Sequence, residues 1–296
     1  MILLTIVTIT VPILLVVAFT TLFERQVMAS LQRRMGPQTS GIGGLLQPFY
    51  DGLKLGIKEP ILPELALSGA FIIAPMIAFV LSQISLSVIF ISDSSFQGLI
   101  LMALSSLAVY GVLLAGWASN SKYSFLGSLR SVALMISYEL GFGAVLLSIC
   151  LFLTDSTGMN SLNFAEVSSD TLLVFLPLFC IFLIVILAES KRIPFDLPEA
   201  EAELVAGFNV EYSSLGFALF FIAEYANLSI LSAMASIYFL GGISALKIIA
   251  ILFFFVWVRG TLPRYRADSF MKIGWKSLLP LSLALFSFYA SFDYIF

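Results

Sequence analysis

Long apolar runs alternate with short polar segments along the whole chain. A helix needs about 20 mainly apolar residues to cross a bilayer, whereas spanning strands show short alternating segments. The runs in this chain are long and continuous, so the pattern predicts an all-α polytopic membrane protein without a soluble domain. We expect eight transmembrane helices within a single membrane domain of residues 1–296: 2–23, 65–91, 96–118, 132–153, 171–188, 213–235, 242–258 and 275–289.

The segment that follows the first run has a different pattern. Residues 41–58 place apolar side chains four positions apart, at Leu45, Phe49, Leu53 and Ile57, and group polar side chains on another face. This pattern predicts an amphipathic helix that lies in the membrane interface. Such a helix can be an ordinary anchor or the lip of a lateral entrance for an amphiphile, and spacing alone favours the anchor.

The basic residues mark one side of the membrane. Fourteen of the fifteen Lys and Arg lie after the first expected helix or between helices 3 and 4, 5 and 6, or 7 and 8. Lys247, near the start of the seventh helix, is the exception. Because basic loops stay on the inner side, we expect these loops inside and both termini outside.

The composition then limits the chemistry. Hydrophobic residues make up 60% of the chain and charged residues 11%, and there is no histidine. This excludes a histidine-ligated haem, zinc or copper site and any Ser-His or Cys-His catalytic unit. Two cysteines, Cys150 and Cys180, are too few for a four-thiolate iron–sulfur cluster. A net charge of −3 gives no reason to expect nucleic acid.

Three glutamates fall inside or at the end of expected spans. Glu139 follows Arg130 by nine residues, which places it roughly 13 Å into the fourth span. Glu224 lies near the middle of the sixth span, and Glu189 ends the fifth. A charged acid at mid-membrane costs about 2.5–3.5 kcal/mol, and binding a proton relieves part of that cost. We therefore expect proton handling, with a hydrogen-bonded structural role as the alternative.

Residues 189–211 form the densest acidic segment, an inner loop between the fifth and sixth helices. Its acids alternate with apolar residues such as Ile193, Phe195 and Phe208, which indicates a folded, partly buried lobe. Acids this close together repel one another and should titrate together. The members are Glu189, Asp196, Glu199, Glu201, Glu203 and Glu211.

This loop also carries a resemblance to a known family. The string AESKRIPFDLPEAEAELVAGFNVEYSS, followed by AEYANL, closely resembles the signature of subunit 1 of respiratory complex I, the H subunit of bacteria. The stretches FERQVMASLQRRMGPQTSGIGGLLQPFYDGLKLGIKE and RGTLPRYRADSFMKIGWKSLLPLSL agree, so the resemblance covers nearly the whole chain. The sequence departs from the common bacterial pattern at Ser213-Ser214-Leu215, which replaces a glycine-led segment. With the short termini, this resembles a mitochondrially encoded form and implies the mitochondrial inner membrane rather than a bacterial plasma membrane.

The resemblance implies a place in a proton-pumping NADH:ubiquinone oxidoreductase. This subunit would form the floor and the lipid-side entrance of the chamber for its substrate, ubiquinone, without carrying a flavin, iron–sulfur cluster, haem or metal. Expected partners are membrane lipids, the peripheral subunits with the quinone headgroup site and terminal cluster, and small membrane subunits leading to antiporter-like subunits. Matching motifs imply quinone-channel residues at Glu24, Arg25, Arg34, Asp51, Phe221 and Arg264. They imply proton-coupling carboxylates at Glu139, Glu189, Asp196, Glu199, Glu201, Glu203, Glu211 and Glu224.

Two other functions compete with this hypothesis. A stand-alone proton-coupled transporter also explains acids in the membrane, but it favours a deep carboxylate–lysine pair or an inverted repeat, and the sequence has neither. A purely structural anchor for a redox arm needs neither Glu139, Glu224 nor an acidic loop. In the favoured mechanism, quinone reduction changes the charge beside this loop, and the carboxylates carry that change toward the pump.

Overall fold

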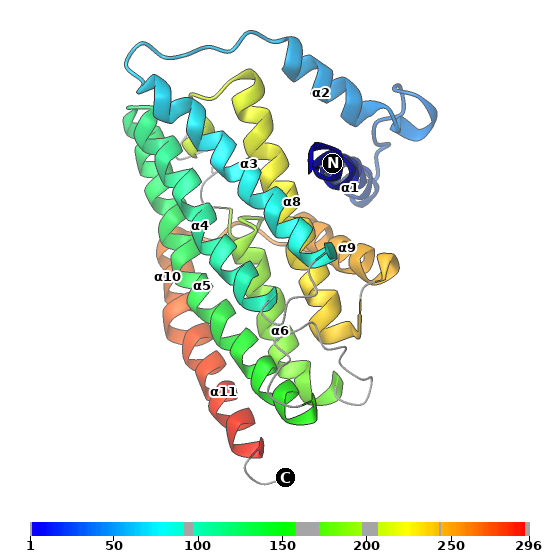
Figure 1. Cartoon of the computed structure of the whole chain (residues 1–296), viewed down its shortest axis with the longest axis vertical. Coiled ribbons are helices and arrows are strands. Elements are labelled where there is room, and N and C mark those ends of the chain that lie inside the picture. Colours follow the sequence, from blue (N-terminus) through cyan, green and yellow to red (C-terminus); the bar gives the residue numbers. More distant parts are fainter. Residues whose placement is uncertain (1, 92–96, 158–171, 197–206, 243, 294–296) are drawn as a thin grey trace.

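The computed structural model describes residues 2–91, 97–157, 172–196, 207–242 and 244–293 (Figure 1). Every regular element in these ranges is helical, which confirms the all-α prediction. Within the described ranges, six helices are long and apolar enough to cross a membrane, and Val174–Glu189 is a shorter apolar helix. A count of eight spans and the side on which each terminus lies stay predictions. The elements are α1 (Ile2–Leu31), η1 (Ile42–Gly44), α2 (Gln47–Ile57), α3 (Ser68–Ile91), α4 (Gln97–Ala118), α5 (Lys122–Thr157), α6 (Leu172–Glu189), η2 (Gly207–Asn209), α8 (Ser214–Leu240), α9 (Ala245–Thr261), α10 (Ala267–Ile273), η3 (Gly274–Leu278) and α11 (Leu279–Asp293).

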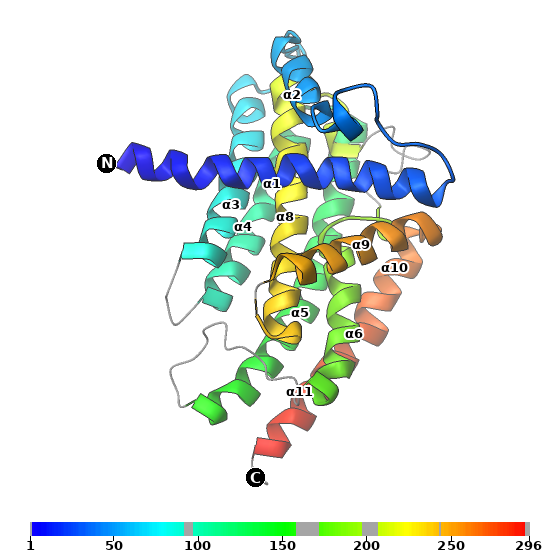
Figure 2. The same ribbon diagram turned by 90° about the vertical axis from the view of Figure 1, so that its right-hand side faces the viewer.

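Most of the long helices lie side by side along the longest axis of the molecule. Helix α3 packs against α4 and α8, while α5 packs against α4, α6 and α11. Helices α1 and α9 run across this bundle rather than along it, and they contact each other and α8 (Figure 2). Side chains from α1, α8 and α9 therefore meet where these helices cross.

Small residues bring α3 and α4 close together. Ala74 and Ala115 are fully buried, and a Cβ atom on Gly111 would lie 3.3 Å from Ala78. Lipid supplies little hydrophobic drive for helix association, so spanning helices associate through close packing at small residues. The α3–α4 contact has this composition.

Several buried hydroxyl groups are satisfied within their own helices. Ser148, Ser232 and Ser236 are fully buried, and each donates to a carbonyl three or four residues earlier at 2.7–2.8 Å. Such bonds remove the cost of an unpaired hydroxyl away from water. Serine can thus fill narrow helix contacts here without a partner on another helix.

Several helices extend past the predicted spans. Helix α5 begins at Lys122 rather than at residue 132, so Lys122 and Arg130 lie on a helix and not in the expected loop. Helix α1 continues to Leu31 instead of ending at residue 23. Hydropathy marks the part of a helix that suits hydrocarbon, whereas backbone hydrogen bonding continues into the interface.

The amphipathic segment is shorter than predicted. The turn η1 and the helix α2 replace a single helix over residues 41–58. Gly41, Gly43 and Gly44 have φ values of 78°, 64° and 78°, a left-handed conformation that favours glycine and breaks a helix. Pro48 stands in the first turn of α2, where its missing N–H costs nothing. Helix α2 contacts α1 and α8 but has no buried residue.

Candidate functional site

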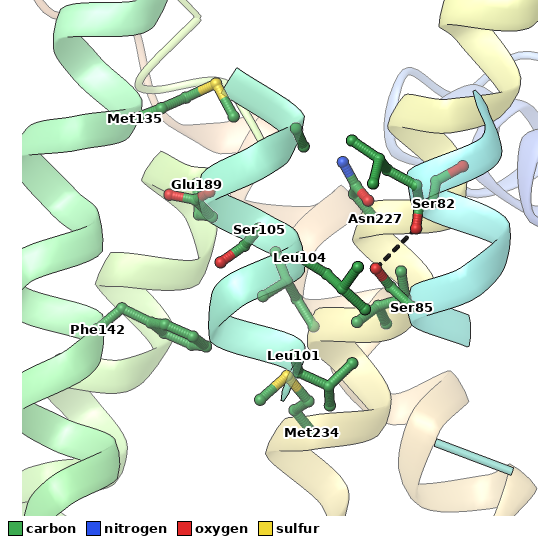
Figure 3. A pocket seen from close by; sticks show the side chains of 14 residues that line it. Ser82, Ser85, Leu101, Leu104, Ser105, Met135, Phe142, Glu189, Asn227 and Met234 are labelled. Atoms are coloured by element: carbon green, nitrogen blue, oxygen red, sulfur yellow. Dashed lines mark hydrogen bonds between the residues drawn. The ribbon is translucent and has the colours of Figure 1, made fainter. Parts of the chain in front are cut away.

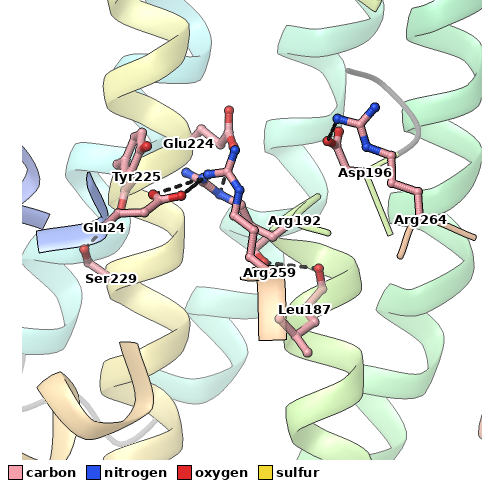
Figure 4. Close-up of polar contacts among 10 residues, drawn as sticks. Glu24, Leu187, Arg192, Asp196, Glu224, Tyr225, Ser229, Arg259 and Arg264 are labelled. Atoms are coloured by element: carbon pink, nitrogen blue, oxygen red, sulfur yellow. Dashed lines mark hydrogen bonds and ion pairs between the residues drawn. The ribbon is translucent and has the colours of Figure 1, made fainter. Parts of the chain in front are cut away.

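A cluster of four charged side chains lies where α1, α8 and α9 meet the segment after α6 (Figure 4). Arg192 donates through Nη1 to both carboxylate oxygens of Glu24, at 3.0 and 3.1 Å. The Nε of Arg192 lies 3.2 Å from Oε1 of Glu224, and Arg259 also donates to Glu24. We call Glu24, Arg192, Glu224 and Arg259 the Glu24 cluster.

The Glu24 cluster is buried at Glu24 and Arg192, partly exposed at Glu224 and Arg259, and balanced in charge. Glu24 is 6% exposed and Arg192 is 8% exposed. The guanidinium carbon of Arg192 also lies 4.4 Å from the centre of the Tyr225 ring, a cation–π contact. Two acids face two arginines, and such pairing is what allows ionised groups to remain away from water. Removing one partner leaves an uncompensated charge, so the four side chains act as a unit.

A second ion pair lies apart from the first in the same view. Asp196, 5% exposed, lies 3.1 Å from the Nη2 atom of Arg264 (Figure 4). The backbone N–H of Tyr265 donates to the carbonyl of Pro194 at 3.0 Å. The ring of Phe195 packs against Phe270 at 4.7 Å. These contacts fix the start of the acidic loop to the segment between α9 and α10.

The end of the acidic loop is held by α5. A Cβ atom on Gly127 would lie 2.8 Å from the backbone of Gly207, so the backbones of these two segments are in direct contact. Ser124 donates to the carbonyl of Phe208 at 3.2 Å. Tyr212 stacks on Phe71 with ring centres 4.0 Å apart, and burial raises the pKa of its hydroxyl above the usual range. The loop is therefore tied down on both sides of residues 197–206.

A third pair lies on the surface and joins α1 to α2. The Arg25 Nη1 atom lies 2.6 Å from Oδ2 of Asp51. Gln47 donates to Oδ1 of the same carboxylate at 3.0 Å. Both charged side chains are more than one third exposed, so water screens this pair far more than the Glu24 cluster.

Two small cavities surround Glu189. Their volumes are about 40 and 50 Å³, and Met135, Glu189 and Asn227 line both. A cavity needs about 10–15 Å³ to hold a water molecule, so each cavity has room for water. The Oε2 atom of Glu189 is buried and has no hydrogen-bond partner among the described residues.

The two cavities lead in different directions from Glu189. The first reaches hydroxyl groups of Ser82 and Ser85 on α3 and of Ser105 on α4, in the centre of the bundle (Figure 3). The second reaches Glu224, a member of the Glu24 cluster. Glu189 therefore lies between the charged cluster and a serine-lined interior.

Glu139 lines a larger space on another face of α5. This groove has a volume of about 460 Å³ and lies between α4, α5 and α11, with Met102, Leu283 and Phe286 among its lining residues. The hydroxyl of Ser106 lies within hydrogen-bonding reach of the Glu139 carboxylate. Glu139 is also close enough to Glu189 for their charges to repel.

The structure brings together most, but not all, of the residues that the sequence singled out. Glu24 and Glu224 share Arg192 as a partner, Arg25 pairs with Asp51, and Arg264 pairs with Asp196. Phe221 packs against Tyr225 at 5.5 Å, beside the Glu24 cluster. None of the six residues expected in the quinone channel lines any of these three cavities, so their shared role stays a prediction.

Other expected residues lie elsewhere. Arg34 bonds to Gln32 in the exposed turn after α1, and Glu211 joins none of the ion pairs between described residues. Glu199, Glu201 and Glu203 lie outside the described residues. Within the described ranges, no three His, Cys, Asp or Glu side chains come together to hold a metal ion.

Sequence reasoning missed four residues of this region: Arg192, Tyr225, Asn227 and Arg259. In the sequence, Arg192 and Arg259 indicate only the inner side of the membrane. A rule that each buried acid needs a partner would have pointed to Arg192, which follows Glu189 within the acidic loop. Tyr225 and Asn227 follow Glu224 on the same helix, but no pattern in the sequence separates them from structural residues.

Comparisons with known proteins show the family to which the chain belongs. A family model described as NADH dehydrogenase matches residues 4–290. The chain is 70% identical to NADH-ubiquinone oxidoreductase chain 1 of Chlamydomonas reinhardtii, over 95% of this chain and 96% of that protein. It is 48% identical to the H subunit of the NADH-quinone oxidoreductase of Rickettsia typhi, over 94% of this chain and 89% of the relative. The resemblance to subunit 1 of complex I is confirmed, and the chain belongs to the NADH dehydrogenase family.

Proposed function

We propose that this chain is the core membrane subunit of a proton-pumping NADH:ubiquinone oxidoreductase in the mitochondrial inner membrane. Its part is to form the lipid-side entrance and the floor of the ubiquinone chamber and to pass the effect of quinone reduction to buried carboxylates. The names of the relatives support the enzyme and its quinone substrate. The high identity to the Chlamydomonas chain supports the mitochondrial form.

One observation supports the coupling role above all. Arg192 contacts Glu24 on α1 and Glu224 on α8, and Glu224 lines a cavity that it shares with Glu189. A change of charge near α1 therefore has a short route, through one guanidinium and one water-sized cavity, to an acid inside the bundle.

The chemistry of the substrate supplies that change of charge. Ubiquinone takes up two electrons and two protons when it is reduced to the quinol, and the electrons arrive before or with the protons. A negative quinone near α1 attracts Arg192 and weakens its contact with Glu224. Glu224 then accepts a proton from Glu189 through the second cavity, and Glu189 regains a proton from Glu139. Electrons come from a peripheral partner subunit, and small membrane subunits receive the protonation signal next to Glu139.

Replacing Glu189 by Gln in the assembled complex tests this proposal. The amide keeps the size of the side chain but cannot exchange a proton, so we expect assembly to continue while quinone reduction coupled to pumping falls about tenfold or more. Glu64→Gln is the matched control, because Glu64 is exposed and lies outside all three cavities. Wild-type rates of both quinone reduction and pumping in Glu189→Gln would remove this residue from the mechanism.

A further inference from the structure

Helix α2 poses a problem of attachment, because it has no buried residue with which to pack. On the side of α1, it is held by the exposed pair of Arg25 with Asp51 and by an edge-to-face contact of Phe49 with Phe19 at 6.4 Å. Gln26 also donates to the carbonyl of Gly43, ahead of the helix, at 2.9 Å. These contacts lie at or near the surface, so another attachment must fix the far end of the helix.

Ser214 supplies that attachment from the first residue of α8. Its hydroxyl lies 3.0 Å from the carbonyl oxygen of Leu55 and 2.5 Å from that of Lys58, and the side chain is part of a residue only 2% exposed. The last carbonyls of a helix have no partner within it. One hydroxyl hydrogen is thus shared between two acceptors at the end of α2, in bonds that are partly buried.

Ser214 makes these bonds from a strained backbone conformation. Its φ value is 56°, in the left-handed region where a side chain is strained and glycine is favoured. A strained residue persists where the surrounding structure holds it in place. Glycine at this position would avoid the strain but could not bond to α2.

Ser213 also holds the segment around α2 against α8. It is the N-cap residue of α8, where a serine commonly accepts a hydrogen bond from the first turn of its own helix. The Ser213 side chain makes no such bond, and its hydroxyl accepts the backbone N–H of Ile61 at 3.0 Å instead. Two successive serines therefore hold the end of α2 and the segment that follows it.

We propose that Ser213 and Ser214 form a latch that fixes α2 against α8 and thereby sets the access of long-tailed quinones to the chamber. The inference rests on the proposed function and places its lipid-side entrance at α1, α2 and α8, which contact one another. Both serines are positioning residues, since they act through α2 and not by contact with the quinone. A short-tailed quinone crosses this border with less of its length and depends less on the latch.

The test uses the whole complex in its membrane, with Ser214→Gly combined with Ser213→Ala. The glycine removes the hydroxyl and also relieves the strained backbone, so we expect the variant chain to fold. We expect amide hydrogens of residues 47–57 to exchange about tenfold faster, because the helix loses its buried hydrogen bonds. We expect KM for a ten-unit isoprenoid ubiquinone to rise about threefold or more, with kcat and the KM for a short-tailed ubiquinone unchanged. Ser236→Ala is the control, because Ser236 is buried in α8 and bonds only within that helix.

Two results would overturn the latch. Unchanged exchange in α2 means that the serines do not hold it, and faster exchange with unchanged KM values means that the position of α2 does not control access. A photoreactive long-tailed ubiquinone separates this failure from that of the proposed function. Labelling of residues 10–31 or 47–57 in the wild-type chain keeps the entrance role whatever the serine variants do. Absence of that labelling refutes the entrance and the latch together.

Discussion

Two groups of acids near the centre of the described structure differ in their partners. In the Glu24 cluster, the guanidinium of Arg192 pairs with both Glu24 and Glu224, and Arg259 pairs with Glu24. Around Glu189 and Glu139, most described neighbours are serines, asparagine and apolar side chains, and Lys191 and Glu224 line the second cavity with Glu189. The first region holds charge in place, whereas the second contains room for water beside acids that lack such partners.

The two groups of acids suit two different tasks, sensing the electric field and exchanging a proton. An acid paired with arginine keeps its charge and senses changes in the electric field, but it exchanges a proton only when the pair loosens. An acid beside a cavity with room for water exchanges a proton readily, but no neighbouring cation stabilises its charged form strongly. Glu224 belongs to both regions, because it contacts Arg192 and lines the cavity of Glu189. It is the point at which a change of field can become a change of protonation.

The largest expected effect comes from removing the cation that holds the first region together. Arg192→Met keeps most of the volume but leaves Glu24 and Glu224 without their shared partner. Breaking a buried pair from one side costs about 3–5 kcal/mol, enough to prevent stable assembly. Native gel electrophoresis of membranes from the variant should show little intact complex.

A matched variant sharpens this result. Arg192→Lys keeps the charge but loses the fork that reaches both carboxylates, so we expect assembly with reduced quinone reductase activity. Combining Arg192→Met with Glu24→Gln removes one uncompensated acid and should restore part of the assembly. Full assembly of Arg192→Met alone would show that the four side chains do not form a structural unit.

The second region should respond in the opposite way, with activity affected more than assembly. Glu139→Gln removes a proton-exchanging group from the 460 Å³ groove but leaves its volume and its neighbour Ser106 unchanged. We expect normal amounts of complex and a several-fold loss of pumping. The loss should be smaller than that of Glu189→Gln, because other proton-exchanging groups can enter the larger groove and replace Glu139 in part. Proton uptake by inverted membrane vesicles per NADH oxidised measures this directly. A loss of assembly instead would place Glu139 among the structural acids.

The comparison also explains how much the sequence could predict. Hydropathy and the acid positions are sufficient for the all-helical fold and for Glu139, Glu189 and Glu224 as unusual residues. The position of Arg192 could not be predicted, because its partner Glu24 lies on a helix that crosses the bundle and is distant in sequence. Periodicity describes which residues share a face of one helix, and it carries no information about which helices cross.

The same limit applies to the ends of the helices. Apolar content falls where α5 leaves the hydrocarbon, so hydropathy predicts a start at residue 132, although the helix begins at Lys122. Gly41, Gly43 and Gly44 are poor helix formers, but their left-handed turn does not follow from composition. Backbone geometry at such points depends on contacts that form only in the folded chain.

A smaller effect is expected at the second ion pair. Arg264 is 42% exposed at the side chain although Asp196 is buried, so solvent screening limits the coupling energy to about 1 kcal/mol. The single variants Asp196→Asn and Arg264→Gln and their double variant form a cycle that isolates this term. We expect KM for ubiquinone to change in each single variant, with a coupling of about fivefold in kcat/KM. Additive effects of the two single variants would mean that the pair does not act as one.

The smallest effect should come from the pair on the surface. Arg25 and Asp51 are 49% and 36% exposed at their side chains, and exposed pairs contribute at most about 1 kcal/mol, less as salt rises. Asp51→Asn keeps the bond that Gln47 can make and removes the charge, so amide exchange in α2 should rise by no more than about threefold. The increase should disappear at high salt, where the wild-type pair is screened as well. Because α2 also depends on Ser213 and Ser214, a larger and salt-independent increase in Asp51→Asn would shift the main attachment of α2 from α8 to α1.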